Sequence, residues 1–158
     1  MSERRVFLFL QGPPSRFWYE LANGLEAAGQ KTVRVNLSAG DWLYWLKSGA
    51  YNYRGSFKNW RGWLEQLIER EGVTDILYYA DRLPYHVVAQ EIAKARGLYV
   101  TAVEFGYLRP DWITVERNGM STYSHFPNDP ETIRAIAAAA PDPDLVIRTS
   151  GEQRVSNF

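Results

Sequence analysis

Two carboxylates stand where apolar segments of the chain end, a position typical of catalytic acids and bases. Asp81 follows the apolar segment 75–79, and Glu104 closes the apolar segment 99–104. A carboxylate in such a place can accept a proton from a substrate hydroxyl, above all where burial raises its pKa. If both segments are neighbouring parallel strands, Asp81 and Glu104 converge at one crevice, because ligands bind beyond the carboxyl ends of such strands.

Cationic side chains flank both carboxylates. Arg82 and His86 follow Asp81, and Arg109 follows Glu104. Guanidinium and imidazolium groups form strong hydrogen bonds with anionic substrate groups. The alternative is a structural ion pair in which Arg82 or Arg109 only neutralises a nearby carboxylate, since such pairs also perturb pKa values. His125, in a polar segment before Phe126-Pro127, has the setting of a surface histidine.

A third candidate segment, Gln11-Gly12-Pro13-Pro14-Ser15, follows the apolar run 6–10. It contains neither the Lys-Ser/Thr pair of a P-loop nor a Gly-x-Gly-x-x-Gly motif, so neither nucleotide-binding fingerprint applies. Gln11 and Gly12 remain candidates for binding a substrate group where the next helix begins, because helix N-termini favour anions. A tight strand-to-helix turn explains the same residues equally well.

The elements that must position these residues alternate along the chain. Apolar runs and helical periodicity predict strands at 6–10, 32–37, 75–79 and 99–104, and helices at 15–28, 60–71 and 84–96. A short fifth strand is expected at 112–116 and a last helix from Asp129-Pro130, whereas residues 38–58 have the composition of an aromatic-rich loop. This order predicts an α/β fold, a Rossmann-like parallel sheet flanked by helices.

Composition excludes several classes of function. The 158 residues suffice for about one domain, and 18 basic against 18 acidic residues argue against a general nucleic-acid binder. The absence of cysteine excludes disulfides, cysteine-ligated metals and thiol nucleophiles, and two histidines cannot form a three-histidine site. We expect no metal and no cofactor. No apolar run reaches the length of a membrane span or of a signal-peptide core, which favours the cytoplasm.

Several motifs together resemble the capsule polysaccharide biosynthesis and export family, whose members include the β-Kdo transferases that build the lipid-linked primer of bacterial capsules. The resemblance covers about residues 6–130. Its most specific part is the run Glu104–Thr114, followed by Asp81–His86. Supporting matches are Leu10–Pro13, Val35-Asn36, Gly40–Trp42 and Asn52–Gly55.

The resemblance implies the N-terminal half of a two-domain GT-B glycosyltransferase that transfers Kdo from CMP-Kdo to a lipid-linked saccharide. It implies that Asp81 and Glu104 perform the acid/base chemistry. The substrate-binding residues that it implies are Gln11, Gly12, Arg82, His86, Tyr107 and Arg109. Many relatives have a second acid where this chain has Phe105, so a carboxylate pair at that position is not expected. Since the donor-binding half is not among these residues, we expect no activity from this chain alone. We expect a cytoplasmic location, and peripheral association with the inner membrane stays an open alternative.

The tail, residues 141–158, resembles a different family, the cis-prenyltransferases such as undecaprenyl diphosphate synthases. By that resemblance Arg148, Arg154 and Ser156 bind the diphosphate of isopentenyl diphosphate. That family's Asp-Gly-Asn-Gly-Arg motif is missing. We therefore expect a Rossmann-like domain at 1–138 and a chimeric or truncated tail at 139–158. Two alternatives stay open: a cis-prenyltransferase fragment, or a non-catalytic glycan- or lipid-binding module that uses the aromatic stretch 42–53.

Overall fold

The computed structural model describes residues 4–106, 112–120 and 123–140. Strands and helices alternate along most of the chain, as the apolar pattern predicted. They follow in the order β1 (Val6–Phe9), α1 (Phe17–Ala27), β2 (Lys31–Asn36), α2 (Ala39–Trp45), β3 (Tyr51–Asn52), α3 (Phe57–Glu71), β4 (Asp75–Tyr79), α4 (Pro84–Arg96), β5 (Tyr99–Phe105), β6 (Ile113–Arg117) and α5 (Pro130–Ala139).

The strands form one six-stranded sheet in the order β3-β2-β1-β4-β5-β6. The pairs β2–β3, β1–β2, β1–β4 and β4–β5 are parallel, and only β6 runs antiparallel to its neighbour β5. The expected α/β fold with a mostly parallel sheet is therefore confirmed. The strand order reverses between β1 and β4, and open α/β sheets bind their ligands at the carboxyl ends of the strands beside such a reversal.

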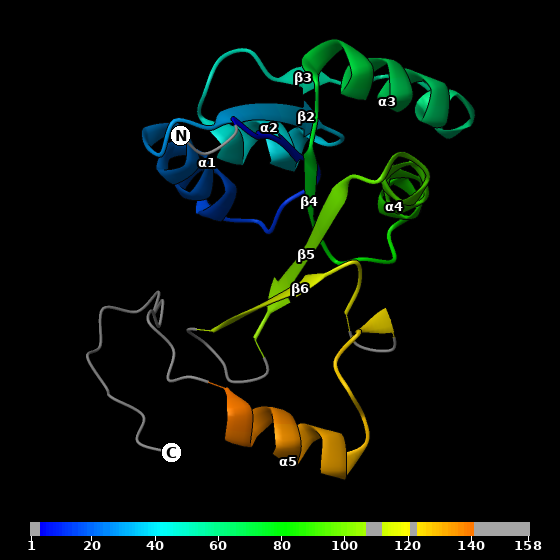
Figure 1. Ribbon diagram of the computed structural model, residues 1–158. Coiled ribbons are helices and arrows are strands. Elements are labelled where there is room, and N and C mark those ends of the chain that lie inside the picture. Colours follow the sequence, from blue (N-terminus) through cyan, green and yellow to red (C-terminus); the bar gives the residue numbers. More distant parts are fainter. Residues whose placement is uncertain (1–3, 107–111, 121–122, 141–158) are drawn as a thin grey trace.

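Helices cover both faces of this sheet, α1 and α2 on one side and α3 and α4 on the other (Figure 1). Successive strand residues point to opposite faces, so β1 sends Leu8 into the core under α3 and α4 and Phe9 into the core under α1 and α2. Trp60 of α3 is completely buried in the first core, and Trp18 of α1 is nearly buried in the second. Much of the unusual aromatic content is thus core.

The expectation of a loop over residues 38–58 is wrong. This segment contains α2 and β3, and α3 begins at Phe57. The local cause is a capping box: the Ser38 hydroxyl accepts a hydrogen bond from the Asp41 N–H at 3.2 Å, and the Asp41 carboxylate accepts one from the Ser38 N–H at 3.0 Å. The Ser-x-x-Asp spacing was visible in the sequence, but the following helix is only seven residues long and carries little periodicity.

A buried ion pair joins α2 to the centre of the sheet. Arg34, in β2, and Asp41, in α2, are both nearly inaccessible, and the Arg34 Nη2 lies 2.8 Å from the Asp41 Oδ1. The guanidinium also donates to the Leu10 carbonyl at the end of β1 and, at 2.8 Å, to the Asn36 side chain. Burial lowers the pKa of Arg34 and the Asp41 charge opposes this shift. The pair therefore connects β1, β2 and α2 at the carboxyl edge.

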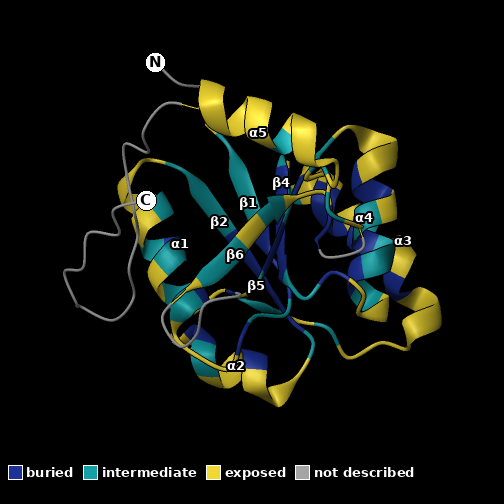
Figure 2. Cartoon of the chain, turned by 90° about the horizontal axis from the view of Figure 1, so that it is seen from below, coloured by how far each residue is buried: buried dark blue, intermediate teal, exposed yellow. Residues whose placement is uncertain are grey.

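The C-terminal part of the described chain is more exposed. β6 pairs with β5, and α5 has no buried residue although Asp129 caps it by accepting a hydrogen bond from the Thr132 N–H at 2.7 Å. Figure 2 shows this contrast between the exposed α5 and the buried central strands. No helix within the described ranges is both long and apolar enough to cross a membrane. The tail with Arg148, Arg154 and Ser156 lies outside the described residues.

Replacing Asp41 with alanine should destabilise the protein by about 3–5 kcal/mol, because the buried Arg34 charge loses its partner. Urea unfolding measures this loss. The matched control is Glu20→Ala, since Glu20 of α1 forms an exposed ion pair with Arg16, the residue before α1, and its removal should cost less than about 1 kcal/mol. Adding Arg34→Met to Asp41→Ala should recover part of the stability. Equal losses for Asp41→Ala and Glu20→Ala would contradict a structural role for the pair.

Candidate functional site

The structure places Asp81 and Glu104 at the same edge of the sheet. β4 and β5 are adjacent and parallel, with Tyr79 opposite Val103, and the Ala80 N–H donates to the Val103 carbonyl at 3.0 Å. Asp81 thus follows the end of β4, and Glu104 stands one residue before the end of β5. The topology expected from the apolar pattern brings the two acids to neighbouring strand ends.

The two carboxylates have different surroundings. Asp81 is 7% exposed, and its Oδ2 accepts a hydrogen bond from the N–H of the buried Met120 at 3.1 Å. Glu104 is half-buried, and its side-chain carboxylate forms no hydrogen bond or ion pair with another residue that the structure describes. Asp81 therefore ties the segment after β6 to the end of β4, whereas the Glu104 carboxylate has no such partner among the described residues.

Backbone strain marks the same strand end. Ala80, between β4 and Asp81, has a φ of 61°, a left-handed conformation that costs an alanine free energy. Its carbonyl lies 2.7 Å from the Nδ1 of His86, and its N–H is bonded to β5. These contacts on both sides hold the turn that directs Asp81 back toward Met120.

His86 lies beneath this edge. It has no exposed surface, and its ring stacks on Tyr78 with 4.7 Å between the centroids. The distance from Nδ1 to the Ala80 carbonyl assigns the ring proton to Nδ1. Burial lowers the pKa of His86 to about 4, which leaves the ring neutral at pH 7. A direct contact with an anionic substrate, as the resemblance implies, would require the turn above it to move.

His86 Nε2 and the Tyr78 hydroxyl have no hydrogen-bond partner within the described part of the chain, although both atoms are buried. Burial also raises the pKa of Tyr78. The two groups are chemically complementary, because a neutral Nε2 accepts and a phenol donates. This stacked pair supports the strand end, because His86 also bonds the carbonyl of Ala80, which directly precedes Asp81.

The other expected substrate ligands at this edge are partly outside the described residues. The Arg82 side chain is exposed and lies 4.1 Å from the centroid of the Tyr123 ring. It forms no ion pair with Asp81 or Glu104, so the alternative in which Arg82 neutralises one of them is not what the structure shows. Tyr107 and Arg109 lie outside the described residues.

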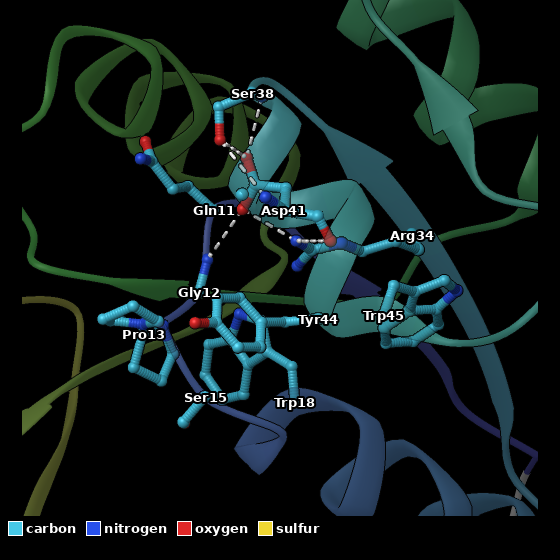
Figure 3. A pocket seen from close by; sticks show the side chains of 12 residues that line it. Gln11, Gly12, Pro13, Ser15, Trp18, Arg34, Ser38, Asp41, Tyr44 and Trp45 are labelled. Carbon is cyan, nitrogen blue, oxygen red and sulfur yellow. Dashed lines mark hydrogen bonds and ion pairs between the residues drawn. The ribbon is translucent and has the colours of Figure 1, made fainter.

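Gln11 and Gly12 line a small cavity between the β1–α1 connection and α2 (Figure 3). Its volume is about 160 Å³, and Ser15 and Tyr44 also contribute to its wall. Gly12 is required here, since a Cβ at this position would lie 2.1 Å from the Trp18 ring. Its N–H donates to the Asp41 carboxylate at 3.3 Å, so the buried ion pair shapes the wall of the cavity.

A second, larger groove lies on the other side of Ser38, at the carboxyl ends of β2 and β3. It has a volume of about 390 Å³, and its lining includes Asn36, Trp42, Asn52 and Arg54. The aromatic stretch 42–53 of the alternative glycan- or lipid-binding module includes Trp42 and Asn52, whereas sequence reasoning assigned Asn36 and Arg54 to no site. The sequence of β2 contained an indication of this site, because Arg34 and Asn36 alternate there with valines. In a sheet covered by helices on both faces the polar side chains are buried as well as the valines, so they need polar partners.

No group of three or more histidine, aspartate or glutamate side chains that could hold a metal ion occurs in the described ranges.

Comparison with known proteins identifies a family. Residues 74–154 match the family described as capsule polysaccharide biosynthesis protein. The capsule polysaccharide export protein KpsS of Escherichia coli is 38% identical over 132 residues, which cover 84% of this chain and 34% of KpsS. The capsule polysaccharide modification protein LipB of Neisseria meningitidis serogroup B is 31% identical over 122 residues, covering 76% of this chain and 29% of LipB. The chain thus spans about a third of the length of these relatives.

A weaker similarity connects the chain to another family. An isoprenyl transferase of Rhizobium meliloti is 34% identical over 94 residues, which cover 60% of this chain and 31% of that protein. The cis-prenyltransferase resemblance in the sequence analysis rested on the tail at 141–158 alone. An alignment of 94 residues extends beyond that tail. The capsule family match also enters the tail and continues to residue 154.

Acidification should destabilise the protein through His86. An unfolded histidine has a pKa of about 6.5, whereas the folded value is about 4, so the unfolded chain binds the additional proton between these values. This contribution to stability is complete above about pH 6.5 and is lost as the pH falls toward 4. We expect His86 to contribute a loss of about 2 kcal/mol between pH 7 and pH 5.

Urea unfolding at the two pH values measures this effect. His86→Phe keeps a ring against Tyr78 and should remove that part of the pH dependence, at a constant cost of about 1 kcal/mol for the lost hydrogen bond. His125→Phe, at the other histidine, is exposed and should keep it. A pH dependence that persists in His86→Phe would show that other groups cause it.

Proposed function

The chain belongs to the capsule polysaccharide biosynthesis protein family, and from this premise we propose that it is the acceptor-binding part of a capsule glycosyltransferase of the GT-B type. The proposed reaction transfers Kdo from CMP-Kdo to a lipid-linked saccharide. The observation that carries the proposal is the open Glu104 carboxylate beside the buried Asp81 at the carboxyl edge of β4 and β5.

The chemistry of sugar transfer assigns a role to each acid. An acceptor hydroxyl forms a bond to the anomeric carbon of the donor sugar while the bond from that carbon to the CMP phosphate oxygen breaks, and CMP leaves with the electron pair. The hydroxyl proton needs a base within hydrogen-bond reach. In this proposal Glu104 accepts that proton, because its carboxylate has no other partner among the described residues. Asp81 is a positioning residue that holds the segment around Met120.

Anionic groups of the substrates need cations at the same edge. Arg82 is exposed beside Asp81 and is steadied by the Tyr123 ring, which makes it the described residue best placed for this task. The proposal keeps Tyr107 and Arg109 as further ligands, and Gln11 and Gly12 at the small cavity. His86 supports the site from below through the Ala80 carbonyl.

The proposed partners follow from this reaction. They are a lipid-linked saccharide acceptor and a CMP-sugar donor, and they favour a cytoplasmic protein that contacts the inner membrane peripherally. Because the chain spans about a third of its capsule relatives, we propose that a further part of such a protein binds the donor. The division into residues 1–138 and a tail at 139–158 stays a proposal, and the family match crosses it.

Incubation of this chain with CMP-Kdo and a lipid-linked saccharide primer should give saturable acceptor binding but no transfer. Transfer needs the donor held in position, and positioning supplies much of the rate. Mass spectrometry of the primer detects product, and tryptophan fluorescence measures binding. Glu104→Gln should leave acceptor binding unchanged, because the proposed role of Glu104 is proton transfer. Turnover by the chain alone would contradict the need for a donor-binding part, and absence of acceptor binding would contradict the acceptor-side assignment.

The isoprenyl transferase similarity favours a second candidate function, condensation with isopentenyl diphosphate. A diphosphate needs several converging cations, and the Asp-Gly-Asn-Gly-Arg motif of the cis-prenyltransferases is missing from this sequence. We therefore expect no saturable binding of isopentenyl diphosphate at micromolar concentrations, and no difference between the wild type and Arg148→Ala in isothermal titration calorimetry. Micromolar affinity that Arg148→Ala removes would favour the prenyltransferase instead, and Arg134→Ala, a cation outside the tail, is the control.

A further inference from the structure

The groove at the carboxyl ends of β2 and β3 lies apart from the acids of the proposed reaction. Its lining comes from β2, the start of α2 and the segment around β3, whereas Asp81 and Glu104 lie at the ends of β4 and β5 on the other side of β1. The groove and the small cavity at Gln11 share Ser38 in their walls. The carboxyl edge therefore has two neighbouring hollows, one at Gln11 and one at the ends of β2 and β3. We call the hollow lined by Asn36, Trp42, Asn52 and Arg54 the β2–β3 groove.

An exposed tryptophan forms one wall of the β2–β3 groove. Trp42 is 66% exposed, whereas Trp18, Trp45 and Trp60 are buried in the two cores. Exposing so much apolar ring costs free energy in water. A flat aromatic ring beside polar groups is the usual platform for one face of a sugar ring, because the indole provides a large and rigid apolar surface.

Two amides, those of Asn36 and Asn52, also line the groove. Asn36 is 3% exposed, and its Nδ2 donates to the Asn52 Oδ1 at 2.9 Å while its own Oδ1 accepts from the Arg34 Nε. This chain of bonds fixes the orientation of both amides. The Asn52 Nδ2 donates to no other described residue, so its N–H groups are available for hydroxyl oxygens of a ligand.

Arg54 gives the groove its charge. It is the one charged side chain among the described residues that line the groove, and it forms no ion pair within the described part of the chain. The turn that presents it is rigid: the Tyr53 N–H donates to the Asn36 carbonyl at 3.0 Å, and the Tyr53 ring packs on Trp60. A Cβ on Gly55 would lie 2.5 Å from the Tyr53 hydroxyl, so a larger residue would disturb this turn.

From these contacts we propose that the β2–β3 groove binds a carboxylated sugar unit of the acceptor, at a distance from the unit that receives the new sugar. The sugar ring lies on Trp42, its hydroxyls accept hydrogen bonds from Asn52, and its carboxylate pairs with Arg54. The volume of about 390 Å³ is within the range of small-molecule sites. The guanidinium group suits a carboxylate because it can form two parallel hydrogen bonds. This inference rests on the proposed function, whose acceptor it describes in more detail.

The test uses ¹⁵N-labelled protein and the methyl glycoside of Kdo as the probe, with methyl glucoside as the uncharged counterpart. We expect the probe to shift the NMR signals of the Trp42 indole and the Asn52 side-chain amide. Trp42→Ala and Arg54→Gln should each weaken its binding about tenfold. Both side chains are exposed, so the variants should fold normally. Arg54→Gln should also remove the preference for the charged over the uncharged glycoside.

Matched controls separate a local effect from a general one. Leu43→Ala removes the exposed neighbour of Trp42 on α2, and Arg96→Gln removes an exposed cation at the end of α4; neither residue lines the groove, and neither change should alter binding. CMP serves as a competitor, since a nucleotide also combines a ring with an anionic group. If CMP shifts the NMR signals of Trp42 and Asn52 and the glycoside does not, the assignment of the groove to a sugar is wrong.

The outcomes distinguish this proposal from the proposed function. If the lipid-linked acceptor binds but the signals of Trp42 and Asn52 do not move, and Trp42→Ala and Arg54→Gln bind it normally, the groove proposal is wrong while the acceptor-side function stands. If the glycoside shifts the groove signals but the lipid-linked acceptor does not bind, the groove recognises acidic sugars and the acceptor-side function is wrong. No shift with the glycoside overturns the groove proposal.

Discussion

The buried ion pair between Arg34 and Asp41 is the interaction on which this end of the molecule depends. A buried charge is tolerated only with a partner and with hydrogen bonds to its remaining polar atoms. Here those bonds come from the end of β1, from Asn36 and from the Gly12 N–H. The requirement draws the strand ends and α2 together, and the cavity at Gln11 and the β2–β3 groove are the spaces left on either side of this contact.

A second constraint acts at the ends of β4 and β5. The strained Ala80, held by His86 on one side and by Val103 on the other, turns the chain so that Asp81 reaches Met120. Asp81 is then occupied, while no other described residue bonds the Glu104 carboxylate. Two acids that occupy similar places in the sequence thus have different chemical capacities, one structural and one available for proton transfer. The neutral, buried His86 belongs to the support of this turn.

Apolar periodicity predicted the four parallel strands and the helices α1, α3 and α4, because strands and helices of this length show their buried faces locally. It failed for α2 and β3, which have seven and two residues. Their signal was polar: the Ser38 and Asp41 spacing of a capping box, which short helices need because they have few internal hydrogen bonds. The family resemblance carried by Asp81–His86 and Glu104–Thr114 was confirmed by the match over residues 74–154.

By itself the sequence determined the alternation of strands and helices and the family, since both depend on residues that are close along the chain. It placed Asp81 and Glu104 at the ends of two apolar segments, and the parallel pairing of β4 with β5 brought these ends to one edge. Only the tertiary structure decided which polar groups are occupied and which are free. Asp81 is bonded to Met120, and Arg34 to Leu10, across 39 and 24 residues of sequence. The order of strands in the sheet and the burial of each group determine these partners, because an unpaired buried charge costs too much free energy. Neither strand order nor burial can be derived from the spacing of residues along the chain.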